Sequence, residues 1–91
     1  MKILIVDDEI LFRKSISMAL KKEGFFVFES DSIKGAKEII INEEPEIVFL
    51  DVNLPDGNGI DLLEWAISGY PDITFIMMTA YGKVKDAIES V

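Results

Sequence analysis

The sequence contains no cysteine and no histidine. The lack of cysteine excludes disulfides, thiolate metal sites and cysteine nucleophiles, and the lack of histidine excludes imidazole ligands and histidine acid–base chemistry on this chain. Basic residues are few as well, with 9 lysines and arginines against 17 aspartates and glutamates, a formal net charge of −8. Because this charge repels phosphates, we expect no direct binding to nucleic acid or to an anionic membrane surface.

Long hydrophobic runs are also lacking. The first run, residues 3–6, ends in Asp7 and Asp8, so it is neither a signal peptide nor a membrane span, and we expect a cytoplasmic protein. Nevertheless, 49% of the 91 residues are hydrophobic, which is enough to form a core. We therefore expect one small globular domain.

Four short apolar runs predict strands at residues 3–6, 25–28, 47–50 and 73–78. Most of their residues are β-branched or aromatic and do not alternate with polar ones, which is typical of strands covered on both faces of a parallel sheet. Helical periodicity fills the intervals, with segments that end at Gly24, span about 33–42 and 60–68, and begin near Lys83. The alternation of strand and helix predicts an α/β fold with a doubly wound parallel sheet.

The helical spacing also predicts which side chains face the core. In the segment 60–68, this set is Ile60, Leu63 and Ile67. In the first helical segment, Arg13 and Lys14 are expected on the solvated side. Asp31 or Ser32 is placed to cap the helix that follows it.

Acidic and hydroxyl side chains directly follow three of the predicted strands. Asp7 and Asp8 follow the first, Asp51 the third and Thr79 the fourth. Ligands of open parallel sheets bind outside the carboxyl ends of the strands. Clustered carboxylates repel one another unless a cation is present, and all-oxygen ligands with few protein groups favour Mg²⁺. An aspartate in such a place can attack phosphorus to form an acyl phosphate.

Three stretches carry a resemblance to a known family. Residues 3–9 (ILIVDDE), 48–59 (VFLDVNLPDGNG) and 78–80 (MTA) resemble the receiver domains of two-component response regulators, and residues 79–89 are most similar to receivers of the NtrC type. The resemblance covers residues 1–91. It implies a flavodoxin-like receiver with strand order 2-1-3-4.

The resemblance also implies the roles of particular residues. Asp51 would accept a phosphoryl group from a histidine kinase or phosphotransfer domain. Asp7, Asp8, Asp51 and the backbone carbonyl of Asn53 would hold Mg²⁺, Thr79 would bind the phosphoryl group and switch, and Asn53 and Tyr81 would tune the lifetime of the acyl phosphate. The domain would be no enzyme beyond its own phosphorylation and dephosphorylation, and it would signal to an output domain in the parent chain, expected to be a transcription activator.

The chain departs from the family pattern at its end. Family receivers have a fifth strand that ends in a lysine beside the phosphoryl group, whereas this sequence ends at Val91. We therefore expect a receiver that lacks the fifth strand–helix unit, and Lys83 and Lys85 do not replace that lysine. The fourth strand would then be an exposed edge, so we expect self-association through it.

Two alternatives remain open at this point. A magnesium-dependent aspartyl phosphatase of the haloacid dehalogenase type would use the same Asp51, but it normally needs an acid two positions later, where this chain has Asn53. A non-phosphorylated interaction module would keep the receiver shape without the chemistry.

Overall fold

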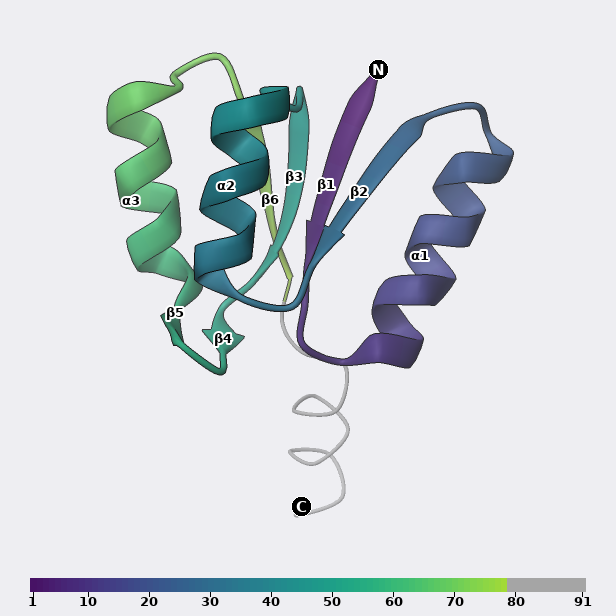
Figure 1. Cartoon of the computed structure of the whole chain (residues 1–91), viewed down its shortest axis with the longest axis horizontal. Coiled ribbons are helices and arrows are strands. Elements are labelled where there is room, and N and C mark those ends of the chain that lie inside the picture. The colour runs from purple at the N-terminus through teal and green to yellow at the C-terminus, as the bar shows by residue number, and fades with distance from the viewer. Residues whose placement is uncertain (79–91) are drawn as a thin grey trace.

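The computed structural model describes residues 1–78, and its elements follow the predicted alternation of strand and helix (Figure 1). In chain order they are β1 (Lys2–Val6), α1 (Ile10–Lys22), β2 (Phe26–Ser30), α2 (Ile33–Glu43), β3 (Ile47–Asp51), β4 (Asn53–Leu54), β5 (Gly57–Asn58), α3 (Gly59–Gly69) and β6 (Thr74–Met78). The short β4–β5 hairpin was not predicted. The helix expected from Lys83 lies outside the described residues.

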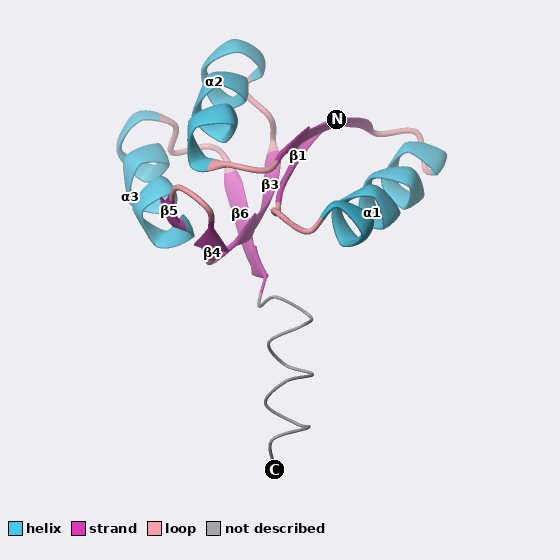
Figure 2. Ribbon diagram, turned by 60° about the horizontal axis from the view of Figure 1, so that its bottom comes forward, coloured by secondary structure: helices cyan, strands magenta, loops and turns pink. Residues whose placement is uncertain are grey.

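The main sheet has four parallel strands in the order β2-β1-β3-β6. This order confirms the expected 2-1-3-4 arrangement. The chain moves from β1 to β2 in one direction and then crosses back to β3 and β6 in the other. Because such crossovers are right-handed, α1 lies on one face of the sheet, and α2 and α3 lie on the other (Figure 2).

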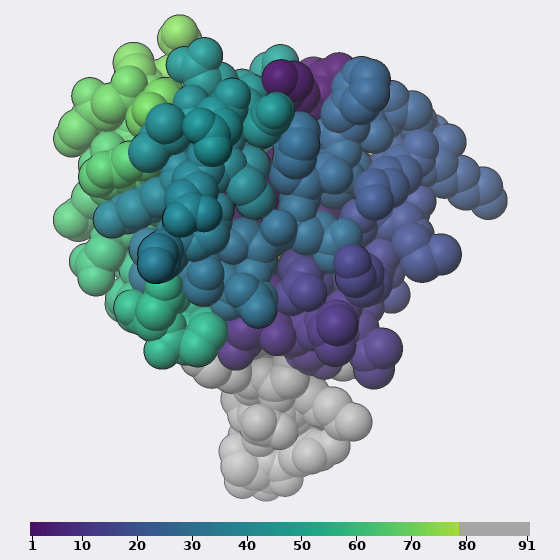
Figure 3. Space-filling model, viewed as in Figure 1, coloured from purple at the N-terminus to yellow at the C-terminus, as the bar shows by residue number. Residues whose placement is uncertain are grey.

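The main hydrophobic core lies between the sheet and the α2–α3 layer. Its buried members are Leu4, Val6, Ala36, Ile40, Val48, Leu50, Leu54 and Leu62. In the space-filling view, the teal atoms of α2 and the green atoms of α3 lie against one another over this face (Figure 3). No helix within residues 1–78 is long and apolar enough to cross a membrane.

The expected inward face of α3 was wrong for two of its three residues: Leu63 packs against the core, but Ile60 and Ile67 do not face it. Leu62 and Ala66 are fully buried, whereas Ile60 and Ile67 are 44% and 58% exposed. The physical reason is the start of the helix: Gly59 is buried against the end of β3, so positions three and seven residues later turn inward with it.

The two outer strands of the described sheet are less covered than their apolar runs predicted. Phe26 of β2 is 69% exposed, and Ile76 and Met77 of β6 are 41% and 38% exposed. By contrast, the central strands fit the prediction, because Ile3 to Val6 of β1 are all buried. Continuous apolar runs therefore do not distinguish the central from the outer positions of this sheet.

Candidate functional site

Three carboxylates meet at the carboxyl ends of β1 and β3, at the lower end of the sheet in Figure 1. Val6 pairs with Leu50 across these neighbouring strands, so Asp7, Asp8 and Asp51 follow side by side. One carboxylate oxygen from each lies within 4.8 Å of the others. Asp7 and Asp51 are buried, with 2% and 1% exposure, and Asp8 is exposed, so the cluster opens to solvent at Asp8.

Backbone amides orient the two buried carboxylates. The N–H of Glu9 donates to Oδ1 of Asp7 at 2.8 Å, and the N–H of Asn53 donates to Oδ1 of Asp51 at 3.3 Å. Each donor lies two residues after its acceptor, a local pattern typical of aspartate in turns. Both side chains are therefore held toward the strand ends.

The electrostatics of the cluster favour a bound cation. Burial raises the pKa of the Asp7 carboxyl, and the nearby charges of Asp51, Asp8 and Glu9 raise it further, against the opposing hydrogen bond from Glu9. A divalent cation would relieve this repulsion, and three carboxylates are the hard oxygen ligands that Mg²⁺ prefers. The residues present therefore fit a magnesium ion.

The other predicted site residues are Asn53, Thr79 and Tyr81. Asn53 is exposed and pairs with Asn58 in the β4–β5 hairpin. The role of its backbone carbonyl as a ligand stays a prediction. Thr79 and Tyr81 lie outside the described residues.

The β4–β5 hairpin folds back tightly on Asp51. The N–H of Gly59 donates to the carbonyl of Val52 at 2.6 Å. A Cβ added at Gly59 would lie 2.1 Å from the carbonyl oxygen of Asp51, so no side chain fits there without a backbone shift. Glycine at this position lets α3 begin directly against the end of β3, the strand that ends in Asp51.

Asp56 is one residue near the site that the sequence did not reveal. Its carboxylate accepts hydrogen bonds from the N–H groups of Ile33 at 2.8 Å and Lys34 at 3.0 Å. It therefore caps α2 together with Ser32, the predicted cap, which accepts from the N–H of Gly35. No local pattern signals this contact, because the donors lie more than twenty residues earlier in the chain.

Arg13 is the second residue that sequence reasoning missed, and its expected solvated position was wrong. Its side chain is 11% exposed. Nε donates to Glu29 at 3.0 Å, and Nη1 donates to the backbone carbonyl of Asp7 at 2.7 Å. A charge on the polar flank of an amphipathic helix does not reveal such a partner, because Glu29 comes from a strand sixteen residues later.

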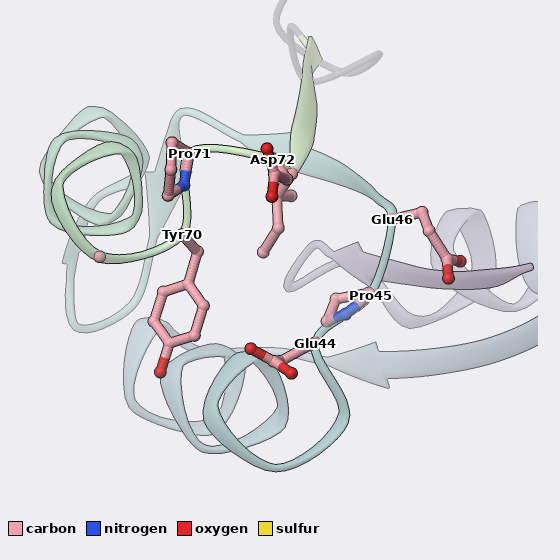
Figure 4. Close-up of a pocket in the computed structure, with 8 residues that line it drawn as sticks. Glu44, Pro45, Glu46, Tyr70, Pro71 and Asp72 are labelled. Atoms are coloured by element: carbon pink, nitrogen blue, oxygen red, sulfur yellow. The ribbon is translucent and has the colours of Figure 1, made fainter.

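A pocket of about 280 Å³ lies elsewhere, where the chain enters β3 and β6 (Figure 4). Its lining includes Glu44, Pro45, Tyr70 and Asp72, and the Glu44 side chain extends toward the Tyr70 ring. This is the amino end of the strands, opposite the carboxylates, so the pocket does not belong to the acidic site.

The fold and the acidic cluster define a small α/β domain with three carboxylates gathered at the carboxyl ends of adjacent parallel strands. Residues 3–91 match the profile of the response regulator receiver domain, and the chain belongs to this family. It is 33% identical over 89 residues to the photosynthetic apparatus regulatory protein RegA of Cereibacter sphaeroides, covering 98% of this chain and 48% of that protein. It is 36% identical over 89 residues to the sporulation initiation phosphotransferase F of Bacillus subtilis, covering 98% of this chain and 72% of that protein.

Solved structures agree with this assignment. The MaeR response regulator bound to beryllium trifluoride matches with a TM-score of 0.78 and 33% identity, over 96% of this chain and 75% of that one. NtrX from Brucella abortus matches with a TM-score of 0.83 and 27% identity, over 98% of this chain and 21% of that one, in agreement with the resemblance to NtrC-type receivers. The chain spans about half the length of the RegA proteins that it matches.

Proposed function

We propose that this chain is a phosphorylation-switched receiver domain in which Asp51 accepts the phosphoryl group. The observation that carries this proposal is the cluster of Asp7, Asp8 and Asp51, whose carboxylate oxygens lie within 4.8 Å of one another at the ends of adjacent strands. Family membership supports it, since the matched relatives include response regulators and a phosphotransferase of sporulation.

The chemistry proposed for Asp51 is a nucleophilic displacement at phosphorus. A carboxylate oxygen of Asp51 forms a bond to the phosphorus of a phosphohistidine, while the bond from phosphorus to the imidazole nitrogen breaks and its electron pair returns to that nitrogen. The N–H of Asn53 holds Oδ1, so we assign Oδ2 as the nucleophile. The product is an acyl phosphate on Asp51 and a free histidine on the donor.

The carboxylates need a counter-charge before they can receive a phosphoryl group. Asp7, Asp8 and Asp51, with the carbonyl of Asn53, would hold Mg²⁺. When bound, this ion would neutralise the cluster and the incoming phosphoryl oxygens. Asp8 is the exposed ligand and would meet the entering ion first. Thr79 as the switch residue, and Asn53 and Tyr81 as tuning residues, complete the proposed site.

The proposed partners follow from the same chemistry. A histidine kinase or phosphotransfer domain would supply the phosphoryl group, and an output domain would read the switch. Relatives named as transcriptional regulatory proteins, TcrX of Mycobacterium tuberculosis and PhoB of Pseudomonas aeruginosa, support a transcription activator as that output.

Binding of a phosphoryl mimic tests the proposal. We expect calorimetry to show Mg²⁺ binding to the wild-type chain and beryllofluoride binding only when Mg²⁺ is present. Asp51→Asn should abolish the beryllofluoride signal. Asp72→Asn, which removes an exposed charge at the opposite end of the sheet, should leave it unchanged. A wild-type chain that bound neither would instead favour the non-phosphorylated interaction module.

A further inference from the structure

We propose that Arg13 is a positioning residue for the acidic cluster, and that it acts by holding the backbone of Asp7 in place for Mg²⁺. This inference rests on the proposed function, because it concerns the affinity of the same cation site. In this account α1 supports the cation site through Arg13, independently of any surface that α1 presents to a partner.

The guanidinium of Arg13 connects three elements at one point. From α1, Nε donates to Oε1 of Glu29 on β2 at 3.0 Å, and Nη1 donates to the carbonyl of Asp7 at the end of β1 at 2.7 Å. The planar fork of arginine presents both donors in a fixed geometry, which a lysine ammonium on a flexible stem does not reproduce. Arg13 therefore ties α1 to β2 and to the backbone at the end of β1.

The ion pair behind this contact is well shielded. The side chains of Arg13 and Glu29 are 11% and 15% exposed, and Lys14 donates to the second oxygen of Glu29 at 3.1 Å. Burial by itself would raise the pKa of Glu29, but the hydrogen bonds from Lys14 and Arg13 outweigh it and lower this pKa. Glu29 therefore stays ionised, and it holds the guanidinium in place.

Asp7 is held at three points, and Arg13 supplies one of them. The N–H of Asp7 donates to the carbonyl of Ser30 at 3.0 Å, its carboxylate accepts from Glu9, and its carbonyl accepts from Arg13. Without Arg13, the carbonyl oxygen of Asp7 would lose its hydrogen bond from Nη1. The peptide that links Asp7 to Asp8 could then rotate, and the two carboxylates would leave their common site.

A positioning role and a direct charge effect predict opposite results for removal of Arg13. If the positive charge of Arg13 acted on the ion, its removal would strengthen Mg²⁺ binding, because two cations repel one another. That charge is paired with Glu29, however. Arg13 then acts on the cluster through its hydrogen bond to the carbonyl of Asp7. Loss of this hydrogen bond should weaken Mg²⁺ binding.

The experiment compares Arg13→Ala with Lys14→Ala in the full 91-residue chain. Both variants remove a partner of Glu29, but Arg13 also contacts Asp7. We expect Mg²⁺ affinity, measured by calorimetry, to fall about tenfold or more in Arg13→Ala, as is typical when a group behind a metal ligand is lost. In Lys14→Ala it should change by less than about twofold, as for an exposed ion pair. Without metal, hydrogen exchange of the Asp7 amide should accelerate in Arg13→Ala and not in Lys14→Ala.

Arg13→Lys keeps the charge and serves as a second variant if Arg13→Ala does not fold. It should still lose Mg²⁺ affinity, because one ammonium does not replace the fork. Unchanged or stronger Mg²⁺ binding in a folded Arg13 variant, with normal exchange at Asp7, would overturn the positioning role. If the wild-type chain bound no Mg²⁺, the proposed cation site would fail instead, and the metal-free exchange of Asp7 would decide the role of Arg13 alone.

Discussion

Gly59 and Asp51 are in such close contact that a Cβ on Gly59 would lie 2.1 Å from the Asp51 carbonyl oxygen. Gly59→Ala should therefore shift the end of β3 or the start of α3. We expect a loss of about 1–3 kcal/mol in the free energy of unfolding, as is typical for overpacking. Urea denaturation monitored by circular dichroism measures this loss.

Gly69→Ala is the matched control, because nothing lies within 4 Å of the position of a Cβ at Gly69 near the end of the same helix. This variant should be neutral or more stable by up to about 1 kcal/mol, because alanine favours helix over glycine. Equal destabilisation by both substitutions would show that the contact of Gly59 with Asp51 is not the cause.

The sequence predicted this contact only in part. Strand-end aspartates and a glycine-containing loop are visible as local patterns, so the places of Asp7, Asp8 and Asp51 in the fold were predictable. The rotation of α3 was not, because Ile60, Leu63 and Ile67 form as good a helical stripe as the one that is buried. The direction in which α3 faces depends on the packing of Gly59 against Asp51. This is a contact between two elements, and helical spacing within α3 does not reveal it.

The carboxylate of Asp56 gives a pH dependence that can be measured. Hydrogen bonds from the N–H groups of Ile33 and Lys34 lower the pKa of this carboxyl. Its ionised form is therefore favoured in the folded state, and its contribution to stability is present above about pH 4 and lost as the pH falls through the lowered value. Asp56→Asn should be less stable than wild type at pH 6, and the difference should shrink toward pH 3. A difference in urea midpoint that is independent of pH would contradict this account.

Asp7 is expected to behave in the opposite way when no metal is present. Its pKa is raised, mainly by burial, so its ionised form costs stability in the folded state at neutral pH. Asp7→Asn should therefore raise the melting temperature of the metal-free chain, since the amide oxygen can still accept from Glu9. Mg²⁺ at about 100 times its Kd should stabilise the wild type by about 2.7 kcal/mol and the variant by less. A melting temperature of the wild type that did not respond to Mg²⁺ would contradict the assigned ligands.

Self-association through the predicted strand 73–78 stays a prediction, and one feature of the structure supports it. Within residues 1–78, β6 pairs with β3 on one side only, and Ile76 is 41% exposed on it. An apolar edge strand favours pairing with another chain, and a lysine on it opposes pairing. Light scattering at high concentration should show dimers or larger species for the wild type and fewer for Ile76→Lys. A monomeric wild type would contradict the expectation.

Long-range side-chain contacts explain what the sequence did not show of the site. Asp56 accepts from amides of α2 that lie more than twenty residues earlier, and Arg13 pairs with Glu29 sixteen residues later while it reaches back to the carbonyl of Asp7. No spacing rule relates donor to acceptor in these contacts. The carboxylate cluster was predictable because parallel strands bring their ends to one edge. Its supporting groups were not, because they depend on how α1 and the β4–β5 hairpin pack.

The central claim is that Asp51 accepts a phosphoryl group, and intact-mass measurement after incubation with acetyl phosphate tests it most directly. The account predicts a mass increase of one phosphoryl group in the wild type with Mg²⁺, none after removal of Mg²⁺ by a chelator, and none in Asp51→Asn. Peptide mapping should place the modification on Asp51. An unmodified wild type under conditions in which Mg²⁺ binding is demonstrated, or a phosphoryl group that persists in Asp51→Asn, would contradict it.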